Sequence, residues 1–349
     1  MAFDPNAPAA AGSGVFGLPS GEADALVVLL PVPWEATTSY GGGAAQGPRA
    51  IKNASAQVDL YDLDVEKPYQ HGIFMLDEDP RLVAMNEEAK ERAQRVIAAG
   101  AELEPAHEAD LVRVNALSDV VNACVETETA RLLAAKKIVG VVGGDHSVPF
   151  GALHALAASR SGAPFGVLHF DAHSDTRNAY EGFTHSHASI MRNVLDRIPA
   201  VTKLVQVGIR DVCEEEISYV TEQGKRVAMF SDRDLSMKKH AGDSFLSIAK
   251  SIAAALPDDV WVSFDIDGLD PRYCPHTGTP VPGGLEVQEV VTILREVVRA
   301  GKRIVGFDLN EVAPNLADEE DEWDGNVGAR MLYKLVGFTL ASQGKARLL

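Results

Sequence analysis

Short apolar runs alternate with longer amphipathic stretches along most of this chain. Apolar and β-branched runs predict strands over residues 25–30, 138–142, 165–170, 203–208, 226–230, 260–264 and 303–307. A helical period rich in Ala, Glu and Arg predicts helices over residues 82–100, 118–137, 242–255 and 287–300. Strands that are apolar throughout and alternate with helices form a mostly parallel sheet covered on both faces. The pattern therefore predicts one α/β domain, an αβα sandwich.

The first residues of the chain differ from the rest. Residues 1–24 are rich in Ala, Gly, Pro and Ser without a hydrophobic period, which predicts a flexible tail or an arm that contacts another subunit. Residues 25–349 contain no linker and no internal repeat, so we expect a single catalytic domain there. The glycines of residues 39–43 suit tight turns or a close approach to a ligand. The acidic run at residues 318–324 is typical of a solvated loop.

Composition narrows the class of protein. The 50 acidic residues against 32 basic ones give a net charge of −18, which argues against a nucleic-acid surface or an anionic membrane as partner. This charge fits a cationic substrate or bound cations, and it also fits solubility alone. The three cysteines form no CxxC pair, which argues against a disulfide framework and a thiolate zinc site. The longest apolar run is too short to span a bilayer. The first basic residue is Arg49, so the sequence shows no positively charged start of a secretory signal. We therefore expect a cytoplasmic protein with free thiols.

Potential metal ligands follow three of the predicted strands. The segments are GGDHS at residues 143–147, DAHSD at 171–175 and DIDGLDP at 265–271. In open α/β sheets, functional groups collect beyond the carboxyl ends of the strands. Side chains at i and i+2 of an extended strand point to the same side, so Asp171 with His173, and Asp265 with Asp267, can converge. Asp175 and His146 complete a set of four carboxylates and two imidazoles.

Such a cage could hold two divalent ions. Carboxylates with imidazole and no thiolate suit Mn²⁺, with Ni²⁺, Co²⁺ or Fe²⁺ as alternatives, better than a structural Zn²⁺. A metal pair of this kind lowers the pKa of a bound water enough to supply hydroxide at neutral pH. Each motif alone is more often a turn or a cap than a metal site. Together they favour a metal site, because burying so many carboxylates without cations would cost a large free energy.

At these residues the sequence resembles the ureohydrolase family of arginases and agmatinases. GGDHS, DAHSD and SFDIDGLDP (residues 263–271) match its three metal-binding signatures, and GTPVPGGL (278–285) and GFDLNEVAP (306–314) extend the match. GPRAI at residues 47–51 resembles the family's entrance segment more weakly. The resemblance implies a three-layer αβα fold with an eight-stranded parallel sheet, assembly into trimers or hexamers, and a dinuclear Mn²⁺ centre.

The resemblance also implies a role for each site residue. One ion would be held by His146, Asp171, Asp175 and Asp265, and the other by Asp171, His173, Asp265 and Asp267, with Asp171 and Asp265 bridging. Asp267 would also stabilise the tetrahedral intermediate. His187, distinct from its neighbour His185, would relay a proton to the leaving amine. Glu311 would pair with the substrate guanidinium, the alternative being an acid at the start of a helix. Asp145, Asp270 and His169 are expected to contact the ligands from behind or to be packing residues, and not to bind the ions.

Departures from the family pattern concern the substrate. Arginases have asparagine two residues after the last Asp of DAHxD, where this chain has Arg177, and this argues against L-arginine. His187-Ala188-Ser189 replaces the His-Gly-Thr that is usual in agmatinases. The chain thus resembles a divergent agmatinase-like branch whose members act on agmatine, guanidinobutyrate, other guanidino acids or guanidine. Arg177 could attract a carboxylate tail, fill the mouth of the site or face solvent. Tyr180, Trp34 and His276 are candidates for the specificity wall.

We therefore expect a binuclear hydrolase that releases urea from a small cationic guanidino compound. Formimidoylglutamate hydrolysis needs the same metals and differs in the product, which would be formamide. A zinc-dependent deacetylase of related fold would need only one ion. A non-catalytic, metal-stabilised oligomer is the alternative outside enzymes.

Overall fold

A sheet of parallel strands forms the centre of the molecule. The computed structural model describes residues 3–10, 12–100 and 102–349. Its eight-stranded sheet has the order β2-β1-β3-β8-β7-β4-β5-β6, and every neighbouring pair is parallel. The strands are β1 (Val27–Val32), β2 (Ile73–Met75), β3 (Ile138–Gly143), β4 (Phe165–Phe170), β5 (Val201–Val207), β6 (Val227–Phe230), β7 (Asp259–Asp265) and β8 (Arg303–Asn310). The expected eight-stranded α/β architecture is confirmed.

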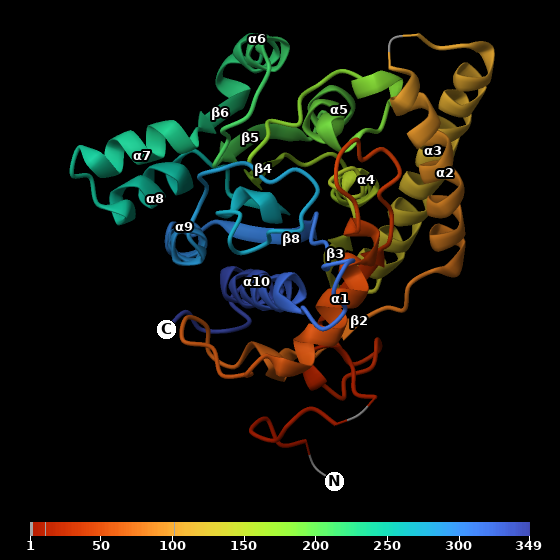
Figure 1. Cartoon of the computed structure of the whole chain (residues 1–349). Helices are drawn as coiled ribbons and strands as arrows, with labels where there is room; N and C mark the ends of the chain where they lie inside the picture. The colour runs from red at the N-terminus through yellow and green to blue at the C-terminus, as the bar shows by residue number, and fades with distance from the viewer. Residues whose placement is uncertain (1–2, 11, 101) are drawn as a thin grey trace.

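Helices cover both faces of this sheet. They are α1 (Gly47–Ala54), α2 (Pro80–Ala99), α3 (Pro105–Ala134), α4 (Phe150–Ser159), α5 (Ile190–Arg197), α6 (Glu214–Glu222), α7 (Asp232–His240), α8 (Phe245–Ala254), α9 (Val287–Arg299) and α10 (Trp323–Ser342). One apolar core lies between the sheet and α1, α8, α9 and α10, and a second lies between the sheet and α2, α3, α4 and α5. Figure 1 shows α9 and α10 on one side of the strands and α4 and α5 on the other. None of the helices in the described part of the chain has the length and apolar character needed to cross a membrane.

Local sequence signals account for several of the helix ends. Helix α2 begins where the Asp79 side chain accepts a hydrogen bond from the Arg81 amide and Pro80 occupies the first turn. Helix α9 begins with a reciprocal pair of hydrogen bonds between Glu286 and Glu289. These capping interactions satisfy amide groups that have no partner within the helix.

Helix α10 was not predicted from the sequence, and its packing explains why. It lies against α1, α9 and β8, and buried residues occur on all of its sides. A helix buried all round shows no amphipathic period. Its first turn contains Asp324, the last residue of the acidic run expected to be a solvated loop. Asp324 is instead fully buried and accepts a hydrogen bond from the His276 amide.

Part of the N-terminal segment packs against the core. Val15, Phe16 and Leu18 are buried and belong to the same apolar cluster as α10. The Phe16 amide donates a hydrogen bond to Ser55 Oγ at 2.9 Å, and the Phe16 ring lies 4.9 Å from the Tyr333 ring. These residues lie inside the segment for which the composition predicts a flexible tail or arm.

The topology brings four strand ends together. Strands β3 and β4 are consecutive in the chain but are separated in the sheet by β8 and β7. The segments that follow β3, β4, β7 and β8 therefore leave the same edge side by side, at the type of position where α/β sheets bind ligands. A Cβ atom on Gly144 would lie 1.9 Å from the Trp34 carbonyl oxygen. This contact fixes the GGDHS turn against the segment after β1.

We predict that Gly144→Ala destabilises the protein, because the new methyl group would overlap backbone atoms that cannot rotate away. Overpacking of this kind costs about 1–3 kcal/mol or more, and the midpoint of chemical denaturation measures it. Gly21→Ala is the matched control, since a Cβ there meets no atom within 4 Å. Equal midpoints for the two variants would contradict the role given to Gly144.

Candidate metal centre and substrate cavity

Three carboxylates surround one ring nitrogen of His146. His146 Nδ1 lies 3.0 Å from Asp171 Oδ2, 3.3 Å from Asp175 Oδ2 and 3.2 Å from Asp265 Oδ2. The imidazole comes from the segment after β3, and the carboxylates come from β7 and the segment after β4. All four side chains are buried. The structure therefore brings together the four residues expected to hold the first ion.

Asp171 links this group to a second one. Its Oδ1 lies 3.5 Å from His173 Nδ1, whereas its Oδ2 faces His146. Asp267 Oδ2 lies 3.0 Å from the same His173 nitrogen, and Asp267 Oδ1 accepts a hydrogen bond from the Ala172 amide. Asp171, His173 and Asp267 form a compact set of donor atoms. One carboxylate thus contributes an oxygen to each of two adjacent groups of ligand atoms.

The donor set fits divalent ions in geometry. Ligand atoms about 2.1 Å from an ion and at right angles to one another would be about 3.0 Å apart. The separations around His146 Nδ1 are of this size. Oxygen and imidazole donors without thiolate suit Mn²⁺ and the neighbouring transition metals.

The buried carboxylates of the cage also favour the binding of cations. Burial, together with the neighbouring Asp171 charge, raises the pKa of Asp175 to about 7. Burial, together with the charges of Asp267 and Asp171, raises the pKa of Asp265 well above its usual range. Burial opposes protonation of His146, but hydrogen bonds to three carboxylates outweigh it and raise the pKa of His146 well above its ordinary value. A cation would replace that proton and allow the carboxylates to remain ionised.

A hydrogen-bonded chain behind His146 sets the tautomer of its ring. Ser263 Oγ donates to Asp308 Oδ1 at 2.8 Å and lies 2.8 Å from His146 Nε2, from which it accepts. The Nε2 proton therefore points to Ser263, and Nδ1 faces the carboxylates with the lone pair that a metal ligand needs. Neither Ser263 nor Asp308 was expected from the sequence to act on the site. Ser263 is two residues before Asp265 on β7, so strand alternation could have indicated it.

His169 orients Asp171 and does not face the centre as a ligand. The Gln206 side-chain amide donates to the Ser174 carbonyl and to His169 Nδ1. The His169 proton is therefore on Nε2, which donates to Asp171 Oδ2 at 2.7 Å. His169 lies within ligand distance of the His146 group, but its nitrogen presents a proton to the carboxylate. Of the two roles expected for His169, contact with a ligand from behind or packing, this geometry supports the first, because the ring fixes the carboxylate shared by both groups.

A cavity of about 180 Å³ opens beside the cage. His173, Asp175 and Asp265 of the cage line this cavity, together with His187 and Glu311. The rest of the lining consists of Ser39, Arg177, Tyr180, Ala188, Asp211, Glu216 and Thr279. The cavity is smaller than the roughly 300–1,000 Å³ that drug-sized ligands occupy. It suits a small substrate.

Glu311 follows β8 directly and is not at the start of a helix. Its amide donates to the Gly144 carbonyl, and its Oε1 accepts from the His146 amide at 2.9 Å. Its backbone has a φ of +63°, which is unfavourable for a residue with a side chain and occurs often at functional sites. Burial, together with Asp265 and Asp145, raises the pKa of Glu311 well above its usual range. A cationic group next to Glu311 would stabilise its ionised form.

His187 lies in the cavity, whereas His185 does not. Among the described residues, His187 Nδ1 has no hydrogen-bond partner, although it is shielded from water. Burial and the charges of His173 and His146 lower the pKa of His187 to about 4, which leaves its ring neutral. His185 Nε2 instead lies 3.2 Å from Asp119 Oδ1, and its ring packs on Phe150. The HSH segment at residues 185–187 therefore places His187 in the cavity and His185 away from it.

The structure revises part of the expected specificity wall. Trp34 is almost completely buried in the apolar core, so its assignment to the wall is wrong. His276 binds Asp324 through Nδ1 at 2.8 Å and is not among the residues of the cavity lining. Tyr180 and Arg177 do line the cavity. Asp145 caps its own turn through the Ser147 amide, and Asp270 accepts from the Arg272 amide, as expected for packing residues.

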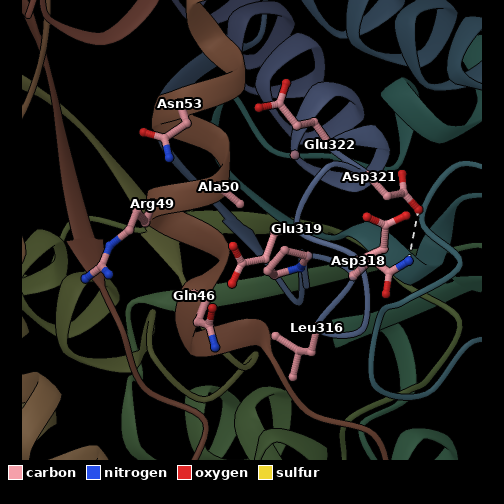
Figure 2. Close-up of a pocket in the computed structure, with 12 residues that line it drawn as sticks. Gln46, Arg49, Ala50, Asn53, Leu316, Asp318, Glu319, Asp321 and Glu322 are labelled. Carbon is pink, nitrogen blue, oxygen red and sulfur yellow. Dashed lines mark hydrogen bonds between the residues drawn. The ribbon is translucent and has the colours of Figure 1, made fainter.

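A larger cavity of about 600 Å³ lies between α1 and the loop before α10. Figure 2 shows the Glu319 carboxylate toward α1, the Asp318 and Asp321 carboxylates away from it, and Arg49 pointing out of the cavity. Arg49 binds Glu78 at 2.6 Å. The acidic side chains are Asp318, Glu319, Asp321 and Glu322. No histidine lines this cavity, and its residues do not include the converging ligand set found beside β4 and β7.

Comparisons with known proteins agree with this geometry. A model of the arginase family matches residues 25–337, and the chain belongs to that family. It is an agmatinase-like ureohydrolase, a hydrolase of guanidino C–N bonds whose family uses a binuclear divalent metal centre.

The similar proteins carry different substrate names. The N(1)-aminopropylagmatine ureohydrolase of Synechocystis sp. is 32% identical over 324 residues, which cover 93% of this chain and 92% of the relative. The proclavaminate amidinohydrolase of Streptomyces clavuligerus is 30% identical over 300 residues, which cover 82% and 80%. A solved structure of proclavaminate amidino hydrolase has a TM-score of 0.72 and 24% identity, over 97% of this chain and 100% of that one. The names of these relatives therefore do not point to one common substrate.

We predict that divalent cations raise the thermal stability of this protein, because they neutralise buried carboxylates. Mn²⁺ at 100 times its dissociation constant would contribute about 2.7 kcal/mol per site, and a chelator would remove this gain. Asp171→Asn should lose most of the metal-dependent shift in Tm. Asp270→Asn, which changes an aspartate outside the cage, should keep it, and loss of the shift in both variants would refute the assignment.

Proposed function

We propose that this enzyme hydrolyses a small guanidino compound to urea and an amine, with six side chains holding two divalent ions. His146, Asp171, Asp175 and Asp265 would hold one ion, and Asp171, His173, Asp265 and Asp267 the other. The observation that carries the proposal is the position of Asp171, whose two oxygens face two adjacent ligand groups. When bound, such a metal pair supplies a hydroxide nucleophile at neutral pH.

Glu311 would hold the substrate guanidinium. Its Oε1 is fixed by the His146 amide, and among the described residues no group donates a hydrogen bond to its Oε2. A carboxylate at the cavity wall can form charge-assisted hydrogen bonds with the planar guanidinium. Because Glu311 is anchored to the backbone next to a metal ligand, this pairing would place the guanidinium carbon beside the cage.

His187 would carry the proton to the leaving amine. The neutral ring lines the cavity, and its buried Nδ1 has no partner among the described residues. A neutral imidazole can accept a proton at one nitrogen and deliver it within the cavity. Asp267, held by the Ala172 amide, would stabilise the tetrahedral intermediate formed at the guanidinium carbon.

The metal, the assembly and the cellular location belong to the same proposal. We expect Mn²⁺ in the native enzyme, with Ni²⁺ as the alternative, because both accept oxygen and imidazole ligands. Cys124, Cys213 and Cys274 are unpaired, which fits the reducing cytoplasm. A homotrimer or homohexamer would follow the expectation from the family.

We predict that Glu311→Gln lowers kcat/KM about 10- to 100-fold, since one charge-assisted interaction with the guanidinium, worth roughly 1.5–3 kcal/mol, is weakened. Urea release under steady-state conditions measures the change, and metal content is determined in parallel. Glu319→Gln changes an exposed carboxylate outside this cavity and should keep normal kinetics. Wild-type kcat/KM in Glu311→Gln would exclude Glu311 from substrate binding.

Urea release from a panel of guanidino compounds tests the function as a whole. The panel contains agmatine, 4-guanidinobutyrate, 3-guanidinopropionate, arginine and guanidine, each with protein loaded separately with Mn²⁺ and Ni²⁺. At least one compound should yield urea, and the better metal should bind at two ions per chain. Absence of urea from every compound, or formamide from formimidoylglutamate, would overturn the proposal.

A further inference from the structure

One wall of the substrate cavity carries a cation. The Arg177 guanidinium carbon lies 4.6 Å from the centre of the Tyr180 ring, and both side chains line the cavity. Stacking on an aromatic face orients a guanidinium plane and leaves its edges available for hydrogen bonds. The Arg177 amide also donates to the Ala188 carbonyl, next to His187. The arginine is therefore held at the wall by its backbone and its ring contact.

The terminal nitrogens of Arg177 remain available. Arg177 Nε lies 3.7 Å from Glu216 Oε2, too far for a good hydrogen bond. Glu216 already accepts hydrogen bonds from the Thr176 and Cys213 amides. Within the described residues, neither Nη atom of Arg177 donates a hydrogen bond to a protein group. The guanidinium edge can therefore bind a ligand.

Two further acidic side chains, Asp211 and Glu216, line the cavity besides the cage and Glu311. Asp211 does not bind Arg177 in the described residues. It is exposed, so water and dissolved ions screen its charge. Glu216 is buried, but it is occupied by the two amides. Glu311, in the segment after β8, lines the same cavity and offers a carboxylate to the guanidinium group of a substrate. The cavity thus contains a carboxylate for the guanidinium and an arginine for the other end of the molecule.

We propose that Arg177 makes this enzyme selective for short guanidino acids, whose carboxylate tail it binds through its Nη atoms. The inference rests on the proposed function and specifies its substrate class. An ammonium tail, as in agmatine, would meet the like charge of Arg177. Free guanidine has no tail and would gain nothing from it. The small cavity, about 180 Å³, restricts the tail to a few carbons.

The test compares 4-guanidinobutyrate with agmatine, two compounds of nearly equal length whose tails carry opposite charges. Wild-type enzyme should hydrolyse 4-guanidinobutyrate with a higher kcat/KM than agmatine or guanidine. Arg177→Gln should lower kcat/KM for 4-guanidinobutyrate about 10- to 100-fold, the effect of losing a charge-assisted pair. The same variant should change kcat/KM for agmatine less than about threefold. Arg177→Lys should retain part of the preference, because it keeps the charge and loses the bidentate geometry.

Arg192→Gln is the matched control for a stacked arginine. Arg192 lies over the Tyr219 ring at 4.2 Å but does not line the cavity. This variant should keep the wild-type substrate preference. Preference for agmatine or guanidine in the wild-type enzyme would overturn the inference. An equal loss for all substrates in Arg177→Gln would also overturn it, because that result indicates a structural role.

A binding measurement separates this inference from the proposed function. Calorimetry with the metal-loaded protein compares 4-aminobutyrate and 1,4-diaminobutane, the amines that the two substrates would release. We expect 4-aminobutyrate to bind more tightly and Arg177→Gln to abolish the difference. If no compound yields urea, the hydrolase proposal fails, while selective binding would still support the carboxylate site. Absence of selective binding would refute the role of Arg177.

Discussion

The structure depends on the burial of several carboxylates at one edge of a parallel sheet. Asp171, Asp175, Asp265 and Asp267 are all removed from water within reach of two histidines. Such a concentration of negative charge is unstable in a protein interior unless cations or protons compensate it. The fold tolerates the arrangement because divalent ions match both the charge and the donor spacing. The buried carboxylates that would destabilise the metal-free protein are therefore the ones that the proposed chemistry uses.

Neighbouring strands hold this cage in a fixed geometry. Ser263 and Asp308, on β7 and β8, set the tautomer of His146 from behind. Gln206 on β5 acts through His169 on β4 to orient Asp171. The contact between His146 and Ser263 joins the segment after β3 to β7, which are far apart in the chain. Strands β4 and β5, and β7 and β8, are neighbours both in the chain and in the sheet. The strand order of the sheet thus supplies both the ligands and the side chains that orient them.

In the proposed enzyme, substrate selection would be separated from the metal chemistry within the same small cavity. Glu311 is anchored beside His146 and faces the cage, whereas Arg177 is stacked on Tyr180 in the segment after β4. Substitutions at Arg177 or Tyr180 would alter the recognised tail without replacing a metal ligand. Loops at the carboxyl end of a conserved scaffold commonly vary in this way. Relatives that share this fold and differ in their named substrates are consistent with such a division.

Local apolar runs and short spacings are enough to predict the fold class, the strands that carry the site and the residues that the structure brings together in the cage. Apolar periodicity could not reveal α10, which is buried on all sides, and it gave no reason to place Asp324 in the interior. The tertiary packing places Trp34 in the core and Arg177 at the cavity wall. It also decided which histidine of the HSH segment enters the cavity and how Ser263 and Gln206 act on the cage. These properties arise from contacts between distant segments, which a linear pattern does not encode.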